Sequence, residues 1–412
     1  MEGFNEKEGR LYVDDLPVSE IANNYSTPAF IYSASEIRNN FNKYTGTLRK
    51  GDLICYAVKA NSNIHILKEL VDLGSGFDVV SGNELKRCIQ AGADPKKIVF
   101  SGVAKSSEDL ELAINEGIFS INIESEDEFD RVCNISQNLN KEVQCAIRIN
   151  PDIPTGSHKY IETGLKTSKF GVGSETLQNI SSIAKDKPLI KISGIACHIG
   201  SQISDNSLII KSLEHLLDAQ KLLIKDEHKL EFLDIGGGLG ITYKEETPGN
   251  PESLILEILN KISALNLNII LEPGRSITGT AGILVTKVEY LKLTEHKNFA
   301  IIDAGMNDLM RPALYDAWHT VKEVKKRDLD KKIYELVGPV CESSDVLAKE
   351  RELSISQGDF IAFMDAGAYG SVMSSNYNSR LKVPEILVNG SSAKLIKRRE
   401  SFEDLIALET NV

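Results

Sequence analysis

Three side chains with nucleophilic or acid–base chemistry stand at the ends of short apolar runs: Lys59, His198 and Glu272. A lysine amine that is partly withdrawn from water loses proton affinity and becomes a nucleophile able to form a Schiff base with a carbonyl group. A solvated side chain is the commoner situation for a single lysine after a strand. The neighbouring residues must therefore decide between the two interpretations.

Two glycine-bearing segments are suited to holding phosphate. Residues 236–240 read Gly-Gly-Gly-Leu-Gly, and residues 272–275 read Glu-Pro-Gly-Arg. Glycines let backbone N–H groups approach phosphate oxygens closely and form concavities that hold anions. Tight turns also need glycine for steric reasons, so only the pair of segments is informative. Together they predict an anion site beside Glu272.

Glu272 and His198 have chemistry that suits an aromatic cofactor. A carboxylate at a buried strand end is costly unless it meets a partner. A protonated pyridine nitrogen is such a partner, and that contact makes pyridoxal phosphate a strong electron sink. His198 alone could be a satisfied core histidine, but in His198-Ile-Gly-Ser201 the imidazole could cover the cofactor ring while Ser201 meets the phosphate.

These side chains need a scaffold that brings strand ends together, and the alternation of the sequence supplies one. Short apolar runs alternate with segments of helical period, which is typical of parallel strands covered by helices. Eight such units predict a (β/α)8 barrel of the α/β class, whose chemistry lies at the carboxyl ends of the strands. The runs are Leu53–Val58, Phe77–Val80, Ile98–Phe100, Ile118–Ile123, Val143–Ile149, Ile192–His198, Phe232–Ile235 and Ile269–Leu271.

The pattern changes after the eighth run. Ile283–Leu291, Phe299–Ile302, Ile333–Val337 and Phe360–Met364 are strand-like and lack long helices between them, which predicts a mainly antiparallel β domain. We expect a barrel domain over residues 30–280, with residues 1–29 and 281–412 forming the β domain.

Composition excludes several classes of protein. Among 412 residues the formal net charge is −12, so we expect no nucleic-acid partner. The polar N-terminus and the lack of a long apolar run predict a cytoplasmic protein without a membrane partner. The six cysteines have no CxxC spacing, so we expect no metal, and only Cys341 lies outside the apolar surroundings typical of inert thiols.

Taken together, these motifs resemble one known family. The chain is similar, from about residue 25 to about 385, to the pyridoxal-phosphate decarboxylases built on the alanine-racemase-type barrel plus a β domain. Within that family, two later segments resemble the members that act on diaminopimelate. The motifs are residues 56–61 (Tyr-Ala-Val-Lys-Ala-Asn), 76–81 (Gly-Phe-Asp-Val-Val-Ser), 198–202, 236–240 and 272–275, and the two later segments are 306–315 and 338–345.

The resemblance implies a role for each matching residue. Lys59 would hold pyridoxal 5'-phosphate covalently, His198 would stack on its ring and Glu272 would face the ring nitrogen. Asp78 would be a cofactor-binding residue. From the residues alone, Asp78 and Arg148 could equally form structural ion pairs at the barrel rim or orient His198 or the cofactor. The phosphate would be bound by Ser201, Gly237, Gly238, Gly274, Arg275 and Tyr369.

The resemblance also implies substrate contacts and an assembly. Arg275, Arg311 and Tyr315 would bind the distal carboxylate of the substrate, for which a guanidinium fork is well suited. Tyr369 and Glu342 would be further substrate contacts, and Cys341 the proton donor to the α-carbon. Cys341 and Glu342 come from the neighbouring subunit in this family, so the resemblance implies a homodimer with shared active sites.

The implied activity is decarboxylation of meso-2,6-diaminopimelate to L-lysine and carbon dioxide, the last step of lysine biosynthesis. A decarboxylase of another basic amino acid or of a carboxylated polyamine is an alternative, but a distal amine needs an acidic contact where this chain has Arg275 and Arg311. Alanine racemase is disfavoured by Glu272 and by the extended segment Arg311–Tyr315. A non-catalytic pyridoxal-phosphate carrier would lack the β domain, and a catalytically inactive homologue would be expected to have lost Lys59 or Cys341.

Overall fold

The computed structural model describes residues 3–154, 163–164 and 168–410, and the chain divides into two compact units. The barrel unit comprises residues 41–241 and 247–276. The sheet unit comprises residues 1–40, 242–246 and 277–412. The barrel unit is therefore inserted into the sequence of the sheet unit.

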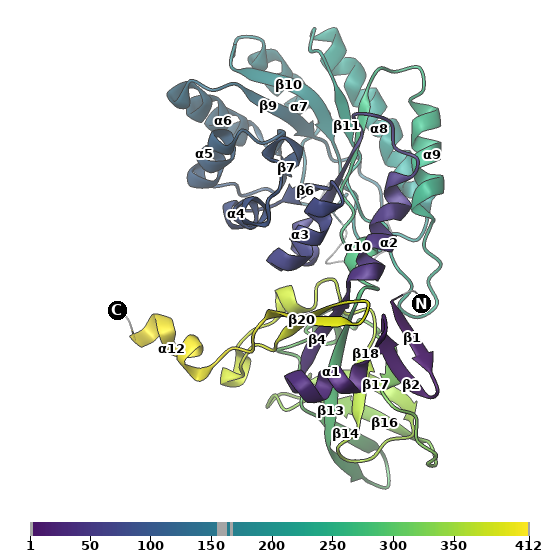
Figure 1. The fold of residues 1–412 in the computed structure, drawn as a ribbon. Helices are drawn as coiled ribbons and strands as arrows, with labels where there is room; N and C mark the ends of the chain where they lie inside the picture. Colours follow the sequence, from purple (N-terminus) through teal and green to yellow (C-terminus); the bar gives the residue numbers. More distant parts are fainter. Residues whose placement is uncertain (1–2, 155–162, 165–167, 411–412) are drawn as a thin grey trace. The chain divides into compact units, whose positions relative to one another are not determined.

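Eight parallel strands in the described residues close into a barrel, which confirms the α/β barrel prediction (Figure 1). Each strand pairs with the next along the chain, and the last pairs with the first. The carboxyl ends of the strands consequently lie at one rim. The strands are β5 (Leu53–Ala57), β6 (Gly76–Val79), β7 (Ile98–Phe100), β8 (Ser120–Ile123), β9 (Val143–Arg148), β10 (Ile190–Ala196), β11 (Phe232–Asp234) and β12 (Asn268–Leu271).

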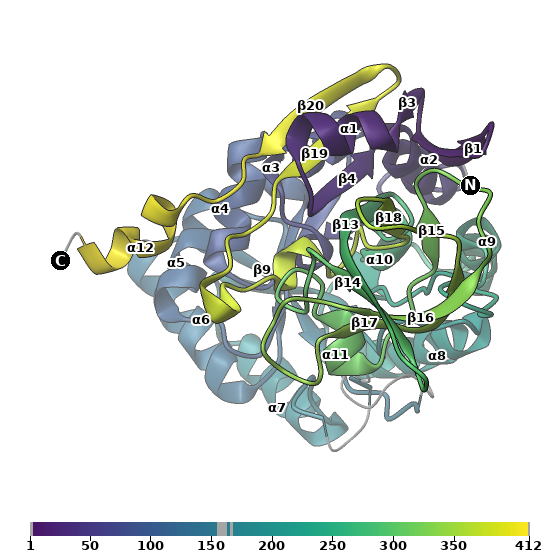
Figure 2. The ribbon, with the colours of Figure 1, turned by 90° about the horizontal axis from the view of Figure 1, so that it is seen from below.

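Helices cover the outer side of these strands, and consecutive helices pack on each other around the unit (Figure 2). They are α3 (Ile64–Asp72), α4 (Gly82–Ala91), α5 (Ser107–Glu116), α6 (Glu126–Leu139), α7 (Ser174–Ala184), α8 (Asn206–Lys225) and α9 (Pro251–Lys261). Shorter or flanking helices are α2 (Ala34–Thr45), η1 (Val58–Ala60), η2 (Pro95–Lys97) and α10 (Arg275–Thr278).

Side-chain caps fix where several of these helices begin. Ser81, Ser106 and Ser125 each accept a hydrogen bond from the backbone N–H three residues further on. Such a cap satisfies one of the N–H groups that the first turn leaves without a helical partner. The starts of α4, α5 and α6 are therefore well defined, and the polar residues that precede these helices stay at the rim.

The barrel interior below the rim is filled by apolar side chains. Cys55, Val99, Ala146, Ala196, Phe232 and Ile270 form one buried cluster. Gly194 makes room for the largest of them, since a Cβ there would lie 2.3 Å from the Phe232 ring. The interior is thus a packed core, and polar side chains can be held only at the carboxyl ends of the strands.

The sheet unit contains a nine-stranded, mainly antiparallel sheet within its described residues, as we predict from the sequence. Seven strands follow the order β17-β16-β14-β13-β4-β19-β20, and β18 pairs with β13 and β15. The strands are β4 (Ala29–Ser33), β13 (Gly282–Leu293), β14 (Asn298–Ile302), β15 (Val321–Glu323), β16 (Lys332–Val337), β17 (Val346–Leu353), β18 (Phe360–Phe363), β19 (Glu385–Asn389) and β20 (Ser392–Lys397).

The sheet unit also contains a small second sheet and several short helices. A small antiparallel sheet is formed by β1 (Phe4–Lys7), β2 (Arg10–Val13) and β3 (Leu16–Pro17). The helices are α1 (Val18–Tyr25), α11 (Arg311–Tyr315), η3 (Ser371–Met373), η4 (Tyr377–Ser379) and α12 (Phe402–Thr410).

The helices of residues 3–154, 163–164 and 168–410 bear on whether the chain could cross a membrane. There, none of the helices combines the length and the apolar character that crossing a bilayer requires.

Candidate active site

Lys59 and Asp78 form an ion pair at the barrel rim. Lys59 lies in η1, directly after β5, and its Nζ is 2.5 Å from Oδ2 of Asp78 in β6. The Asp78 side chain is fully buried, whereas 35% of the Lys59 side chain is exposed. Asp78 therefore fixes the position of the lysine side chain, which stays partly accessible. The sequence left open whether Asp78 forms an ion pair at the rim, and the structure shows such a pair with Lys59.

Glu272 lies directly after β12, and its carboxyl group is buried beside two others. Burial and the neighbouring charges of Asp234 and Asp78 raise the pKa of Glu272 well above its ordinary value. The Ser101 hydroxyl donates a long hydrogen bond of 3.4 Å to Glu272 Oε1. The rim thus gathers three acidic side chains, from β6, β11 and the residue after β12, around one lysine.

His198 follows β10 and carries a neutral imidazole. Burial, followed by the charges of Lys59 and Arg148, lowers the pKa of His198 well below its ordinary value. Its Nδ1 accepts a hydrogen bond of 3.2 Å from the Gly237 N–H, which places the ring proton on Nε2. A neutral ring held at one edge presents a flat face that can pack on another aromatic ring.

The glycine turn brings three strand ends close to one another. A Cβ at Gly237 would lie 2.0 Å from the Glu272 carbonyl oxygen. A Cβ at Gly238 would lie 2.4 Å from the Gly200 carbonyl oxygen, and Gly238 also has a φ of +105°. Neither position accommodates a side chain without moving backbone. The loops after β10, β11 and β12 therefore meet through backbone atoms.

Arg275 and Gly274 extend this arrangement into the next loop. Arg275 is buried and its Nη2 donates a hydrogen bond of 2.9 Å to Ser201 Oγ. A Cβ at Gly274 would lie 3.0 Å from the Ala60 side chain, which leaves little room for a larger residue beside η1. A guanidinium, a hydroxyl and glycine backbone are thus assembled as an anion site requires.

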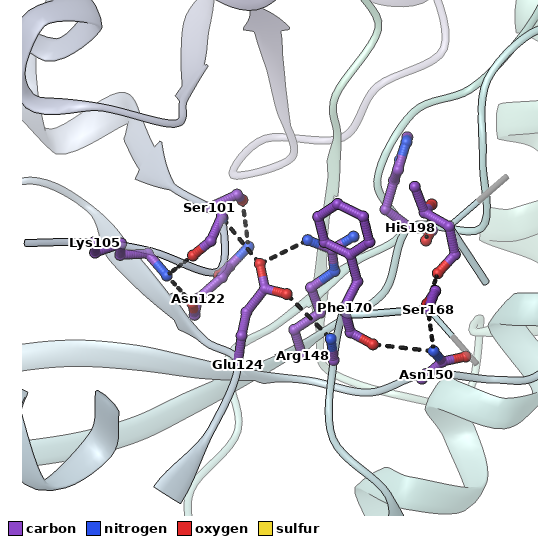
Figure 3. Close-up of polar contacts among 12 residues, drawn as sticks. Ser101, Lys105, Asn122, Glu124, Arg148, Asn150, Ser168, Phe170 and His198 are labelled. Atoms are coloured by element: carbon purple, nitrogen blue, oxygen red, sulfur yellow. Dashed lines mark hydrogen bonds and ion pairs between the residues drawn. The ribbon is translucent and has the colours of Figure 1, made fainter. Parts of the chain in front are cut away.

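A second ion pair supports the rim between β8 and β9 (Figure 3). Arg148 Nη1 lies 2.7 Å from Oε1 of Glu124, and both side chains are buried. Glu124 also accepts hydrogen bonds from the Gly102 and Gly171 N–H groups, at 2.9 and 3.1 Å. The Arg148 guanidinium lies over the Phe170 ring, 4.9 Å from its centroid. Glu124 thereby ties the loop after β7 to the chain that follows β9.

The remaining predicted site residues lie in the sheet unit. Arg311 begins α11, and its buried guanidinium lies 2.7 Å from His319 Nε2 and 4.5 Å from the centre of the Tyr243 ring. Tyr315 ends the same helix and is half-buried. These contacts hold the guanidinium of Arg311 within its own unit.

Tyr369, Cys341 and Glu342 also lie in the sheet unit. Tyr369 has a φ of 56°, which a bulky residue rarely adopts. Cys341 and Glu342 are exposed. The Cys341 N–H donates to Asn378 Oδ1, and Glu342 accepts a hydrogen bond from the Ser344 hydroxyl.

The structure adds two buried polar residues that our sequence analysis did not assign. Asp234 ends β11, and Asn122 lies in β8, where its Nδ2 donates to Asp234 Oδ2 at 2.9 Å and to Ser101 Oγ at 3.1 Å. The signal for Asp234 was a carboxylate inside the apolar run Phe232–Ile235, where it is costly without partners. Asn122 gives the same kind of signal, because it is a polar residue inside the apolar run Ile118–Ile123.

The chain is similar to known decarboxylases in both sequence and structure. Residues 34–279 match the family model described as pyridoxal-dependent decarboxylase, pyridoxal binding domain. The diaminopimelate decarboxylase of Haemophilus influenzae is 45% identical to the chain, with all of both sequences covered. The solved structure of diaminopimelate decarboxylase from Helicobacter pylori complexed with L-lysine superimposes with a TM-score of 0.92 at 40% identity, covering 95% of this chain and 99% of that one. The enzyme from M. jannaschii in complex with L-lysine gives 0.94 at 35% identity, covering 100% and 98%.

Proposed function

The chain belongs to the pyridoxal-dependent decarboxylase family, and on that basis we propose that it converts meso-diaminopimelate to L-lysine and carbon dioxide. The observation that carries the proposal is the cluster of Lys59, Asp78 and Glu272 at the rim of the barrel, in a chain similar over its whole length to diaminopimelate decarboxylases.

The rim residues fit pyridoxal phosphate. Asp78 Oδ1 and Asn122 Oδ1 are buried and have no hydrogen-bond partner within the described residues. Both atoms could therefore accept a hydrogen bond from a bound group. Lys59 has an accessible amine, and His198 has a neutral ring. The chemistry of this donor set is that of a site for an aromatic aldehyde with an anionic group.

Each residue would hold one part of the cofactor. Lys59 would bind it covalently, His198 would cover the ring and Glu272 would face the ring nitrogen. Ser201, Gly237, Gly238, Gly274 and Arg275 would hold the phosphate, joined by the Tyr369 hydroxyl. When bound, pyridoxal phosphate supplies the electron sink that accepts the electron pair left by departing carbon dioxide.

Arg311 and Arg275 favour a substrate with a distal carboxylate. The Arg311 guanidinium is held by His319 and Tyr243, so less conformational entropy is lost when it binds an anion. Tyr315 would add a hydroxyl donor. Ornithine and arginine carry a distal cation, which two guanidinium groups would repel.

Cys341 and Glu342 would complete the site of a second subunit. Both are exposed, which suits residues that act on a neighbouring chain. Cys341 would donate the proton to the α-carbon, and Glu342 would contact the substrate. The proposal therefore includes a homodimer, acting in the cytoplasm in the last step of lysine biosynthesis.

Product analysis tests the proposal. Purified protein with pyridoxal phosphate is incubated separately with meso-diaminopimelate, ornithine and arginine, and the amines formed are identified. We expect lysine from diaminopimelate and no product from the other two. Lys59→Ala should abolish both turnover and the visible absorbance of the bound cofactor, whereas Lys68→Ala, on the surface of α3, should change neither. Decarboxylation of ornithine or arginine in preference to diaminopimelate would overturn the assignment.

A further inference from the structure

Two aromatic side chains of the sheet unit contact the guanidinium of Arg311. Its Nη1 lies 2.7 Å from His319 Nε2, and its central carbon lies 4.5 Å from the centre of the Tyr243 ring. The two rings meet edge to face, with their centroids 5.4 Å apart. His319 is fully buried and Arg311 is 6% exposed. The contact between guanidinium and imidazole is therefore set by protein atoms and not by water.

The neighbours of His319 decide which of its ring nitrogens carries the proton. Nδ1 lies 2.8 Å from the Met364 carbonyl oxygen, which can only accept a hydrogen bond, so Nδ1 is protonated. A guanidinium can only donate and keeps its charge, so Nε2 must accept the hydrogen bond from Arg311. The imidazole is therefore neutral and carries its proton on Nδ1. This is the opposite tautomer to that of His198.

The backbone around His319 holds the ring in this place. Met364 follows β18, and its N–H donates a hydrogen bond of 2.8 Å to the Thr320 carbonyl oxygen. The next residues form β15, which pairs antiparallel with β18. The imidazole thus joins this strand pair to Arg311 at the start of α11.

We propose that His319 is a positioning residue that sets the affinity of Arg311 for the distal carboxylate of the substrate. A neutral acceptor orients the guanidinium and leaves its positive charge intact, whereas a carboxylate at this position would compete with the anion of the substrate. The inference deepens the proposed function and rests on it, because it requires Arg311 to bind that carboxylate.

Two substitutions separate the contact with Arg311 from the contact with Met364. Glutamine places its carboxamide near the position of Nε2, so His319→Gln keeps an acceptor for the guanidinium. Asparagine is shorter and places its carboxamide near the position of Nδ1, so His319→Asn keeps a donor for the Met364 carbonyl oxygen and loses the acceptor. If His319 only satisfied the buried backbone, His319→Asn would be the milder change.

Kinetics with meso-diaminopimelate distinguish the two roles. The distal carboxylate does not change during decarboxylation, so a contact with it stabilises the bound substrate and the transition state alike. We expect His319→Asn to raise KM by about 10- to 100-fold, the range for a lost hydrogen bond to a charged group, with little change in kcat. His319→Gln should raise KM less. Equal KM values for wild type and His319→Asn, or equal rises in the two variants, would overturn the inference.

Two ligands show whether the effect belongs to the carboxylate. L-Lysine carries a carboxylate, and 1,5-diaminopentane has the same two amines and the same carbon spacing between them without it. Their dissociation constants are measured on the holoenzyme by competition with the substrate. His319→Asn should weaken the binding of lysine by the factor seen in KM and leave the binding of diaminopentane as in wild type. Equal weakening for both ligands would overturn the inference.

Two controls test for general damage. Trp318, the single tryptophan of the chain, precedes His319, and the Arg351 guanidinium carbon lies 3.2 Å from the centre of its ring. Both variants should keep the wild-type emission maximum of this tryptophan. His228 is a half-buried histidine of the barrel unit whose Nε2 contacts the Ser181 carbonyl oxygen, and His228→Asn should bind lysine as wild type does. Weakened lysine binding in that control would show a general effect of the substitution, and the inference would fall.

The tautomer can be measured on the wild-type holoenzyme even if a variant fails to fold. In nuclear magnetic resonance spectra of protein with isotope-labelled histidine rings, His319 should carry a proton on Nδ1 and none on Nε2, before and after lysine binds. Its signals are identified by their loss in either variant. A proton on Nε2 would overturn the inference. Failure of the wild type to form lysine from meso-diaminopimelate would instead count against the proposed function itself.

Discussion

Individual residues at the rim differ in how well the sequence predicts them. Lys59, His198 and Glu272 follow apolar runs, so their place at the strand ends follows from the barrel geometry alone. Asp234 and Asn122 escaped prediction because each is a single polar residue inside an apolar run. Their importance depends on contacts that join β8, β11 and Ser101, the residue after β7, and no local pattern encodes such contacts.

The exposed thiol is the residue whose role can be tested most directly. Cys341→Ala should bind pyridoxal phosphate as wild type does and lose turnover by roughly 10²–10⁴-fold, the range for removal of a general acid. Absorbance of the bound cofactor and lysine release are measured side by side. Cys133→Ala, which removes a buried thiol of α6, is the control that should retain turnover. Undiminished lysine production by Cys341→Ala would require a different proton donor.

Asp365 makes stability depend on pH. Burial raises its pKa to about 7, whereas in the unfolded chain an aspartate titrates near about 3.9. The folded chain therefore holds a proton that the unfolded chain releases, and the free energy of unfolding falls as pH rises through that window, by at most about 4 kcal/mol. Asp365→Asn removes this loss.

The variant should be more stable than wild type at pH 8 and equal to it near pH 4. Urea unfolding of the full chain at both pH values measures the difference. Asp316→Asn, an exposed position in the same unit, should show no such trend. A constant difference across the pH range would contradict the assignment of this pH dependence to Asp365.

At the scale of elements, the barrel strands were the most predictable part of the chain. Parallel strands buried on both faces are continuously apolar, so their positions follow from composition over a few residues. Helix α7 begins without a clear signal in the sequence. Its N-cap is Gly173, which offers no capping side chain, so the usual start signal is missing.

The Glu124–Arg148 ion pair joins the ends of β8 and β9, and a substitution of Glu124 alone removes it. Glu124→Gln leaves the buried guanidinium of Arg148 without its counter-charge, and removing one partner of a buried pair costs about 3–5 kcal/mol. We expect a lower urea midpoint and faster hydrogen exchange at the Gly171 and Gly102 amides. Glu126→Gln, at the start of α6 on the surface, should change neither. Unaltered exchange at both glycines would mean that the carboxylate does not hold these loops.

At the scale of the whole molecule, the sequence left the arrangement of units least determined. The domain bounds at 30 and 280 remain a prediction. Strand β4 pairs with β13 and β19, which lie far along the chain, and residues 242–246 belong to the sheet unit. Which segments belong to the sheet unit depends on contacts between residues far apart in the sequence, and local periodicity does not predict such contacts.

Sharing of sites between subunits is a property of the assembly and is tested by mixing inactive variants. Lys59→Ala and Cys341→Ala chains, allowed to exchange subunits, should recover about a quarter of wild-type activity, because half of the dimers are mixed and each has one intact site of two. Mass spectrometry confirms the exchange. Complete inactivity of a mixture shown to contain mixed dimers would argue for sites built within one chain.

The insertion of the barrel into the sheet unit also orders events during synthesis. All eight barrel strands leave the ribosome consecutively, between Leu53 and Leu271, whereas β4 emerges before them and must wait for β13 and then β19 to cover its two edges. An uncovered strand edge is a template for pairing with other chains. The nascent protein therefore carries an aggregation-prone segment for as long as it takes to translate most of its length, and early closure of the barrel shortens the stretch of unfolded chain exposed beside it.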